Sequence, residues 1–120
     1  NKYPHYEGIF TDLANIPPVK PVLRLSSASP AADPDGYHTL EITVANPSPN
    51  FLFDARIAID QETQGLTVFY TDNYLSQLPG EQKSVTLRIG NKDGMAPVRS
   101  TTVRLSGWNC EEIQASLRLK

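Results

Sequence analysis

The sequence lacks the features that disulfide-linked, membrane-spanning and nucleic-acid-binding proteins require. Cys110 is the only cysteine among the 120 residues, so a disulfide within the chain is excluded. No apolar run approaches the roughly 20 residues that a membrane-spanning helix needs, and we therefore expect no membrane partner. The formal net charge is −2 and the basic residues are scattered singly, which predicts no nucleic-acid partner.

Residues that build metal and catalytic sites are also sparse. His5 and His38 are the two histidines, and neither has a cysteine or carboxylate at a metal-ligand spacing. The Asp- and Asn-rich turns at 33–36 and 91–94 are too short for calcium loops and lack the downstream glutamate. A Gly-x-Ser-x-Gly nucleophile motif and a Gly-rich phosphate loop are both missing. We expect no metal, no cofactor and no catalytic residue in this chain.

What the sequence does contain is a series of short alternating segments separated by turns. Ten prolines and seven glycines indicate many turns and argue against long helices. The predicted strands cover residues 19–25, 38–44, 51–59, 66–70, 83–89, 101–105 and 113–119. In the third of these strands, over 51–59, the predicted inward residues are Phe53, Ala55, Ile57 and Ile59. The pattern predicts an all-β fold, an immunoglobulin-like antiparallel β-sandwich of about seven strands.

The sandwich is expected to occupy residues 19–120. Residues 1–18 carry irregularly spaced apolar side chains and end in Ile16-Pro17-Pro18, which favours a connector from a preceding domain. Packing of this segment on the sandwich's own flank is the alternative. Because the chain starts at Asn1 and its only methionine is Met95, we expect it to be a piece of a longer polypeptide.

The segment 69–81 is the most distinctive part of the sequence. It joins aromatic, acidic and amide side chains to a Leu-Pro-Gly turn, and we expect it to separate the two halves of the sandwich. Asp72 and Asn73 are predicted to bind backbone groups in a structural corner, and Pro79 and Gly80 to direct the next strand. Asp72 and Glu81 are therefore not expected to form the carboxylate pair that glycoside hydrolysis requires.

Aromatic residues on the surface could serve as a sugar platform. The candidates for carbohydrate contact are Tyr74, Trp108 and Tyr37. For Trp108, which follows a Ser-Gly step, a packing role between the two sheets is favoured over a role in binding. Cys110 is predicted to be a small, partly buried thiol.

Three segments together carry a resemblance to a known family. The string from Phe69 to Glu81 resembles a signature of the C-terminal immunoglobulin-like domain of glycoside hydrolase family two, in the branch of exo-β-D-glucosaminidases and β-mannosidases. Residues 103–109, which read Val-Arg-Leu-Ser-Gly-Trp-Asn, are similar to the segment that closes that domain. Tyr6-Glu-Gly-Ile9 resembles the motif with which the family enters it.

The resemblance implies a larger parent enzyme with a central (β/α)8 barrel that holds the catalytic carboxylates. This chain would then be a non-catalytic accessory domain that braces the barrel and edges the substrate cleft. Its partners would be the preceding domains, above all the barrel, and a glycan. By the same resemblance the parent is expected to be periplasmic or extracellular. The alternative is an independent carbohydrate-binding module that uses exposed aromatic residues.

Overall fold

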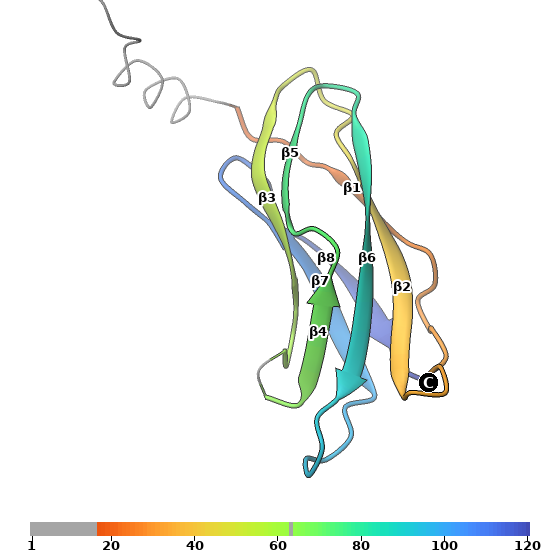
Figure 1. Cartoon of the computed structure of the whole chain (residues 1–120). Helices are drawn as coiled ribbons and strands as arrows, with labels where there is room; N and C mark the ends of the chain where they lie inside the picture. The colour runs from red at the N-terminus through yellow and green to blue at the C-terminus, as the bar shows by residue number, and fades with distance from the viewer. Residues whose placement is uncertain (1–16, 63) are drawn as a thin grey trace, which may run out of the picture.

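The structure, a computed structural model, describes residues 17–62 and 64–120 and shows a sandwich of two four-stranded antiparallel sheets (Figure 1). The strands in these ranges are β1 (Val22–Leu25), β2 (Tyr37–Ala45), β3 (Leu52–Ile59), β4 (Leu66–Tyr70), β5 (Tyr74–Gln77), β6 (Gln82–Asn91), β7 (Ser100–Ser106) and β8 (Ile113–Arg118). Their orders are β1-β2-β6-β4 in the first sheet and β5-β3-β7-β8 in the second. The predicted immunoglobulin-like fold is confirmed, with eight strands instead of seven.

The core lies between the sheets and follows from the alternation of the sequence. In β2, Leu40 and Ile42 are buried while Thr39 and Glu41 between them are exposed, because successive side chains of a strand point to opposite faces. Apolar residues of the paired strand β6 and of the opposite sheet pack against them. The core residues are Val19, Leu40, Ile42, Val44, Leu52, Ala55, Ile57, Ile59, Leu66, Leu75, Val85, Leu87, Ile89, Val103, Leu105, Leu117 and Leu119.

The chain crosses repeatedly between the two sheets. Strands β1 and β2 are neighbours in the first sheet, and β7 and β8 are neighbours in the second. Every connection between β2 and β7 leads from one sheet to the other. The expectation that segment 69–81 separates two halves of the sandwich is therefore wrong, since each sheet combines strands from both sides of this segment.

Segment 69–81 also contains the strand that the sequence pattern did not predict. Its residues Tyr74–Gln77 form β5, an edge strand that pairs with β3 through Leu75 opposite Ala55 and Tyr74 opposite Arg56. Leu75 is fully buried between the sheets, whereas Tyr74 points outward and is 61% exposed. The segment is thus the passage from the first sheet to the second rather than a corner alone.

A bulge in β3 changes which of its residues face the core. The pairing of β3 with β5 shifts register between Leu52 and Ala55. Leu52 is consequently fully buried, and Phe53, which was expected to point inward, is only half-buried. A β-bulge adds one residue to a strand and so reverses the sides that the residues before it occupy. The inward positions of Ala55, Ile57 and Ile59 are as predicted.

The predicted connector over residues 1–18 lies outside the described residues, apart from Pro17 and Pro18. The described chain begins against the second sheet, where Val19 is fully buried and its N–H donates to the Asn109 carbonyl at 2.7 Å. Strand β1 begins only at Val22, so the predicted strand over 19–25 is shorter than expected. Within the two described ranges, no helix is long and apolar enough to span a membrane.

Candidate functional site

Two of the three predicted sugar-contact residues lie around one surface hollow. Tyr74 begins β5 and is 61% exposed, and Trp108 lies in the β7–β8 loop and is 59% exposed. The hollow has a volume of about 360 Å³. Its lining consists of Asp54, Arg56, Tyr74, Ser106, Gly107 and Trp108, and we call it the Tyr74–Trp108 hollow.

Strand register explains why three of these residues are neighbours. Arg56 on β3 lies opposite Tyr74 on β5 and opposite Ser106 on β7. The residues on either side of Arg56 along β3 face the core, so Arg56 and its two partners share the outer face of the second sheet. A row of one guanidinium, one phenol and one hydroxyl therefore crosses three strands and leads to Trp108.

Gly107 allows the loop that carries Trp108 to approach β3 closely. A Cβ atom at this position would lie 2.7 Å from the Cα atom of Ala55 and 2.7 Å from the carbonyl oxygen of Asp54. Both contacts are with backbone, which cannot rotate away, so a larger residue would push the loop off the sheet. The glycine thus sets the position from which the Trp108 side chain leaves the backbone.

Asn109 fixes the other side of the same loop. Its side chain is buried; the oxygen Oδ1 accepts a hydrogen bond from the Phe53 N–H at 2.8 Å. Its Nδ2 group donates to the carbonyls of Phe51 at 2.6 Å and Pro17 at 3.1 Å. The Phe53 ring also meets the Trp108 ring edge-on, with centroids 6.4 Å apart at 87°. Trp108 is therefore held by its backbone and by an aromatic neighbour, and the prediction that it packs between the sheets is wrong.

Tyr74 is held in place by the same strand, β3. The Arg56 Nη1 group donates to the Tyr74 hydroxyl at 3.4 Å, and the Arg56 Cζ atom lies 5.6 Å from the centre of the ring. Asn73, just before Tyr74, accepts a hydrogen bond from the Ile57 N–H through its Oδ1 atom at 2.8 Å. The amide side chain thus replaces a ladder hydrogen bond at the point where β5 begins, and Arg56 orients the phenol.

Asp54 brings a carboxylate to the hollow at a cost in backbone energy. Its φ angle is 54°, in the left-handed region that costs a non-glycine residue roughly 1–2 kcal/mol. The Asp54 N–H donates to the Ser76 hydroxyl at 3.0 Å, while its side chain points outward. Backbone strain of this kind is concentrated at bulges and at functional positions, and here the two coincide.

Tyr37, the third predicted sugar-contact residue, lies elsewhere. It begins β2 in the first sheet and is half-buried, with its ring 6.0 Å from that of Phe69. The Arg88 Cζ atom lies 4.6 Å from the centre of the Tyr37 ring. A Cβ atom at Gly90 would lie 2.7 Å from the ring, so the phenol packs directly on the backbone of β6. Tyr37 thus belongs to a separate aromatic cluster.

The predicted corner residues lie at the two ends of β5. Asp72 accepts a hydrogen bond from the Asn73 N–H at 2.8 Å, before the strand begins. After the strand, Gly80 adopts a φ of 83°, and its N–H donates to the Asn46 carbonyl at 2.8 Å. Pro79, which precedes it, is exposed at the tip of this turn. The residues at these positions turn the chain out of β4 and into β6.

Burial favours the neutral forms of two half-buried groups, Cys110 and Tyr70. Burial, assisted by the charge of Glu111, raises the pKa of the Cys110 thiol to about 11. Burial also raises the pKa of Tyr70, whose hydroxyl donates to the Glu62 carboxylate. Cys110 is half-buried, as expected, and a thiol with this pKa is a poor nucleophile at neutral pH. Among residues 17–62 and 64–120, no group of three or more His, Cys, Asp or Glu side chains is arranged to hold a metal ion.

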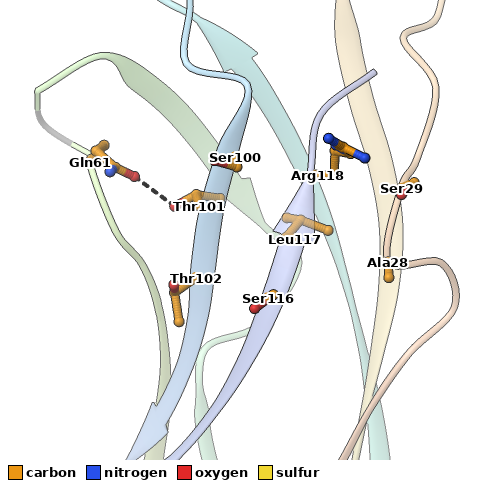
Figure 2. A pocket seen from close by; sticks show the side chains of 9 residues that line it. All are labelled: Ala28, Ser29, Gln61, Ser100, Thr101, Thr102, Ser116, Leu117 and Arg118. Atoms are coloured by element: carbon orange, nitrogen blue, oxygen red, sulfur yellow. Dashed lines mark hydrogen bonds between the residues drawn. The ribbon is translucent and has the colours of Figure 1, made fainter.

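A second hollow lies at the opposite end of β7. It has a volume of about 550 Å³ and is lined by Ala28, Ser29, Gln61, Ser100, Thr101, Thr102, Ser116, Leu117 and Arg118. Figure 2 shows these side chains coming from β7, β8, the segment before β2 and the loop after β3. The Thr101 hydroxyl donates to the Gln61 side-chain oxygen at 2.8 Å, as the dashed line marks. Small hydroxyl side chains without an aromatic ring make this hollow less suited to a ligand than the Tyr74–Trp108 hollow.

The sequence pattern did not identify the polar residues of the Tyr74–Trp108 hollow. Arg56, Asp54 and Ser106 are ordinary polar residues on alternating strands, and only the register places them beside Tyr74. The usable signals were the glycine before the single tryptophan and the asparagine after it. Gly-Trp-Asn indicates a tightly held loop, but the sequence does not say which strand the loop contacts.

Comparison with known proteins identifies the family. Residues 4–110 match the model of the exo-β-D-glucosaminidase Ig-fold domain. An exo-β-D-glucosaminidase of Streptomyces avermitilis is 32% identical over 109 residues, which are 86% of this chain and 12% of that enzyme. A mannosylglycoprotein endo-β-mannosidase of Lilium longiflorum is 40% identical over 47 residues, covering 39% of this chain and 4% of that protein.

A solved structure shares the fold. The crystal structure of the Amycolatopsis orientalis exo-chitosanase CsxA is similar with a TM-score of 0.66 at 24% sequence identity, over 88% of this chain and 12% of that one. The chain thus spans about an eighth of the length of the Streptomyces and Amycolatopsis enzymes, whose remaining length implies further domains. The resemblance carried by 69–81 and 103–109 is confirmed, and the chain belongs to the family of exo-β-D-glucosaminidase Ig-fold domains.

Proposed function

We propose that this chain is a non-catalytic accessory domain of a larger glycoside hydrolase of the exo-β-D-glucosaminidase or β-mannosidase type. The observation that carries the proposal is the match over residues 4–110 to a domain that makes up 12% of the S. avermitilis enzyme. Glycoside hydrolysis requires two carboxyl groups facing one substrate position. The lining of the Tyr74–Trp108 hollow contains a single acid, Asp54, beside the cation Arg56. This lining suits binding better than hydrolysis.

The accessory role we propose is to brace a catalytic (β/α)8 barrel. It is supported by the hydrogen bonds that hold the start of the described chain. The Pro17 carbonyl accepts a hydrogen bond from Asn109, and two hydrogen bonds join Val19 to the β7–β8 loop. The described chain is therefore fastened to the second sheet from Pro17 onward, which suits a domain that is fixed against a neighbour.

The test has two parts, which use the purified chain and the coding sequence upstream of it. Purified 120-residue chain is expected to give no turnover of p-nitrophenyl β-D-glucosaminide or β-D-mannoside. Turnover that co-purifies with the chain and is lost in Asp54→Asn would overturn the non-catalytic role. The coding sequence upstream of Asn1 is expected to encode a (β/α)8 barrel with two carboxylates.

We also propose that the parent enzyme is exported to the periplasm or the medium. Polymeric glycans are degraded outside the cytoplasm, and a domain with one half-buried thiol is compatible with that environment. Immunoblotting of cell fractions tests this point, and accumulation in the cytoplasm alone would contradict it.

A carbohydrate-binding module is the second candidate function. One observation favours it: Tyr74 and Trp108, which are distant in the sequence, line the same hollow. The accessory and binding roles are compatible, since one face of the domain can contact a glycan while another contacts a preceding domain.

A further inference from the structure

We propose that the Tyr74–Trp108 hollow is a binding subsite for a pyranose ring of a β-1,4-linked glycan. The inference goes beyond the accessory role and rests on it only for the choice of glycans to test. The parts of the site come from β3, β5, the end of β7 and the loop between β7 and β8. In Figure 1, β3 and β5 run next to each other at the end of the sandwich from which the described chain enters.

The two aromatic rings supply the surface on which a sugar would stack. The axial C–H groups of a β-linked pyranose form an apolar, weakly positive face that is attracted to the negative face of an aromatic ring. Trp108 and Tyr74 are 59% and 61% exposed, so each presents a large ring area beside the hollow. Most aromatic side chains bury their surface in cores, and exposed rings at one site mark an interaction surface.

The polar groups of the hollow match the hydroxyl groups around the edge of a sugar. Among the described residues, the Asp54 carboxylate and the Ser106 hydroxyl accept no hydrogen bond from another side chain or backbone group. Arg56 uses one of its N–H groups on Tyr74 and has four others that can donate. Carboxylate and guanidinium side chains bind neighbouring sugar hydroxyls, and Asp54 could equally accept from the ammonium group of an amino sugar. The charges of Asp54 and Arg56 offset one another, so the hollow carries no strong net charge of its own.

The site is built before a ligand arrives. Gly107 and Asn109 hold the loop on both sides of Trp108, and the Phe53 ring supports the indole from its edge. Arg56 orients the Tyr74 phenol, and the strained backbone of Asp54 turns its carboxylate outward. A preorganised site loses little conformational entropy on binding. This matters for sugars, because their individual contacts are weak. A volume of about 360 Å³ lies at the small end of the range for ligand sites and suits a short stretch of glycan.

The chain offers a direct spectroscopic readout, because Trp108 is its only tryptophan. We expect hexasaccharides of β-1,4-linked glucosamine, glucose or mannose to change the tryptophan emission of the 120-residue chain in a saturable way. Calorimetric titration of the same samples supplies an independent affinity. At least one of the three glycans is expected to bind, with a dissociation constant of about 1 mM or tighter.

The variants test which rings carry the binding. Tyr74→Ala, measured by tryptophan emission, and Trp108→Ala, measured by calorimetry, are each expected to weaken binding about tenfold. Phe69→Ala is the matched control: Phe69 is 53% exposed but lies in the Tyr37 cluster of the other sheet, and its loss should leave affinity within about twofold. Trp108→Phe keeps a ring and is expected to retain most of the affinity, which guards against a folding defect in Trp108→Ala.

Three results would overturn the proposal. The first is that none of the three glycans binds at 10 mM, which is about tenfold above the expected dissociation constant. The second is that neither Tyr74→Ala nor Trp108→Ala affects binding. The third is that Phe69→Ala loses binding to the same extent as these two variants. Asp54→Asn gives a further test, since the glucosamine oligomer should lose affinity while the two neutral oligomers change little if the carboxylate meets an ammonium group. Equal losses for all three would assign Asp54 to a hydroxyl group and still support the site. Failure to bind any glycan would leave the accessory role standing, because that role is tested by turnover and by the upstream sequence.

Discussion

Replacing Asn109 with alanine should destabilise the domain strongly, because its amide side chain is buried and fully hydrogen-bonded. The side chain is 7% exposed and makes three hydrogen bonds to the backbone, to Phe53 N, Phe51 O and Pro17 O. Each is worth about 1 kcal/mol net, and the partners left behind are shielded from water. We expect Asn109→Ala to lower the free energy of unfolding by about 3 kcal/mol. For a domain of this size this corresponds to a fall in Tm of roughly 12 °C.

The assay is urea unfolding followed by tryptophan emission and by circular dichroism. The midpoint should fall while the denaturant slope stays constant, because the change affects stability and not the surface exposed on unfolding. Gln114→Ala is the matched control, since this exposed amide contacts only the Glu112 carboxylate at 3.4 Å and should change stability by less than about 0.5 kcal/mol. A loss below about 1 kcal/mol in Asn109→Ala would refute the reasoning that this side chain fastens the loop.

Asn109→Asp separates the accepting and donating halves of the amide. A carboxylate keeps the hydrogen bond from the Phe53 N–H but cannot donate to the carbonyls of Phe51 and Pro17. In the folded state the protonated form is favoured, so the pKa of the new carboxyl group is raised above its unfolded value. Relative to the wild type, the variant should be most stable below that unfolded pKa and lose stability as the pH rises through the folded pKa. A pH-independent difference would show that the donated hydrogen bonds contribute little.

The remaining predictions concern two glycines, the thiol and the core. Gly107→Ala is expected to cost about 1–3 kcal/mol and to shift Trp108 emission, because the new Cβ meets the backbone of β3 at 2.7 Å; unchanged emission would contradict this contact. Gly80→Ala, where no atom lies within 4 Å but φ is 83°, should cost about 1–2 kcal/mol in urea unfolding without any change in emission. The rate of Cys110 alkylation by iodoacetamide should rise with pH to a midpoint near 11, and a midpoint near 9 would mean that burial does not protect the thiol. Leu87→Ala, at a fully buried position of β6, should cost about 2–5 kcal/mol by calorimetry, and a loss under 1 kcal/mol would place Leu87 outside the core.

The fold could be predicted because most strands bury one face only. The alternation over 38–44 and 83–89 corresponds to β2 and β6, where apolar side chains face the opposite sheet and polar ones face solvent. The missed strand, β5, breaks this rule. Its second inward position is Gln77, a buried amide whose Nε2 group donates to the Val44 carbonyl at 2.9 Å. With a polar side chain on the buried face and only four residues, β5 shows no period in the sequence.

The candidate site could be predicted only in part, because it depends on distances that alternation does not encode. Tyr74 and Trp108 were identified as aromatic candidates, but their proximity follows from the pairing of β3 with both β5 and β7. The interpretation of Trp108 as a residue between the sheets failed for a related reason. The close approach of Gly107 to β3 keeps the loop outside the sandwich, and the bulge moves Phe53 outward to meet the indole. Both effects are tertiary contacts between segments some fifty residues apart.

The repeated crossing of the chain between the sheets has a consequence for how the domain forms. Neither sheet is a continuous stretch of polypeptide, since only the first and the last strand connections stay within one sheet. In the first sheet β6 pairs with β2 and β4, which both precede it and are separated from it in the sequence by strands of the second sheet. Closing such distant pairs costs chain entropy before their contacts are made, which places folding on the scale of roughly milliseconds to seconds. A ribosome must release nearly the whole segment, through β8, before the sandwich can close.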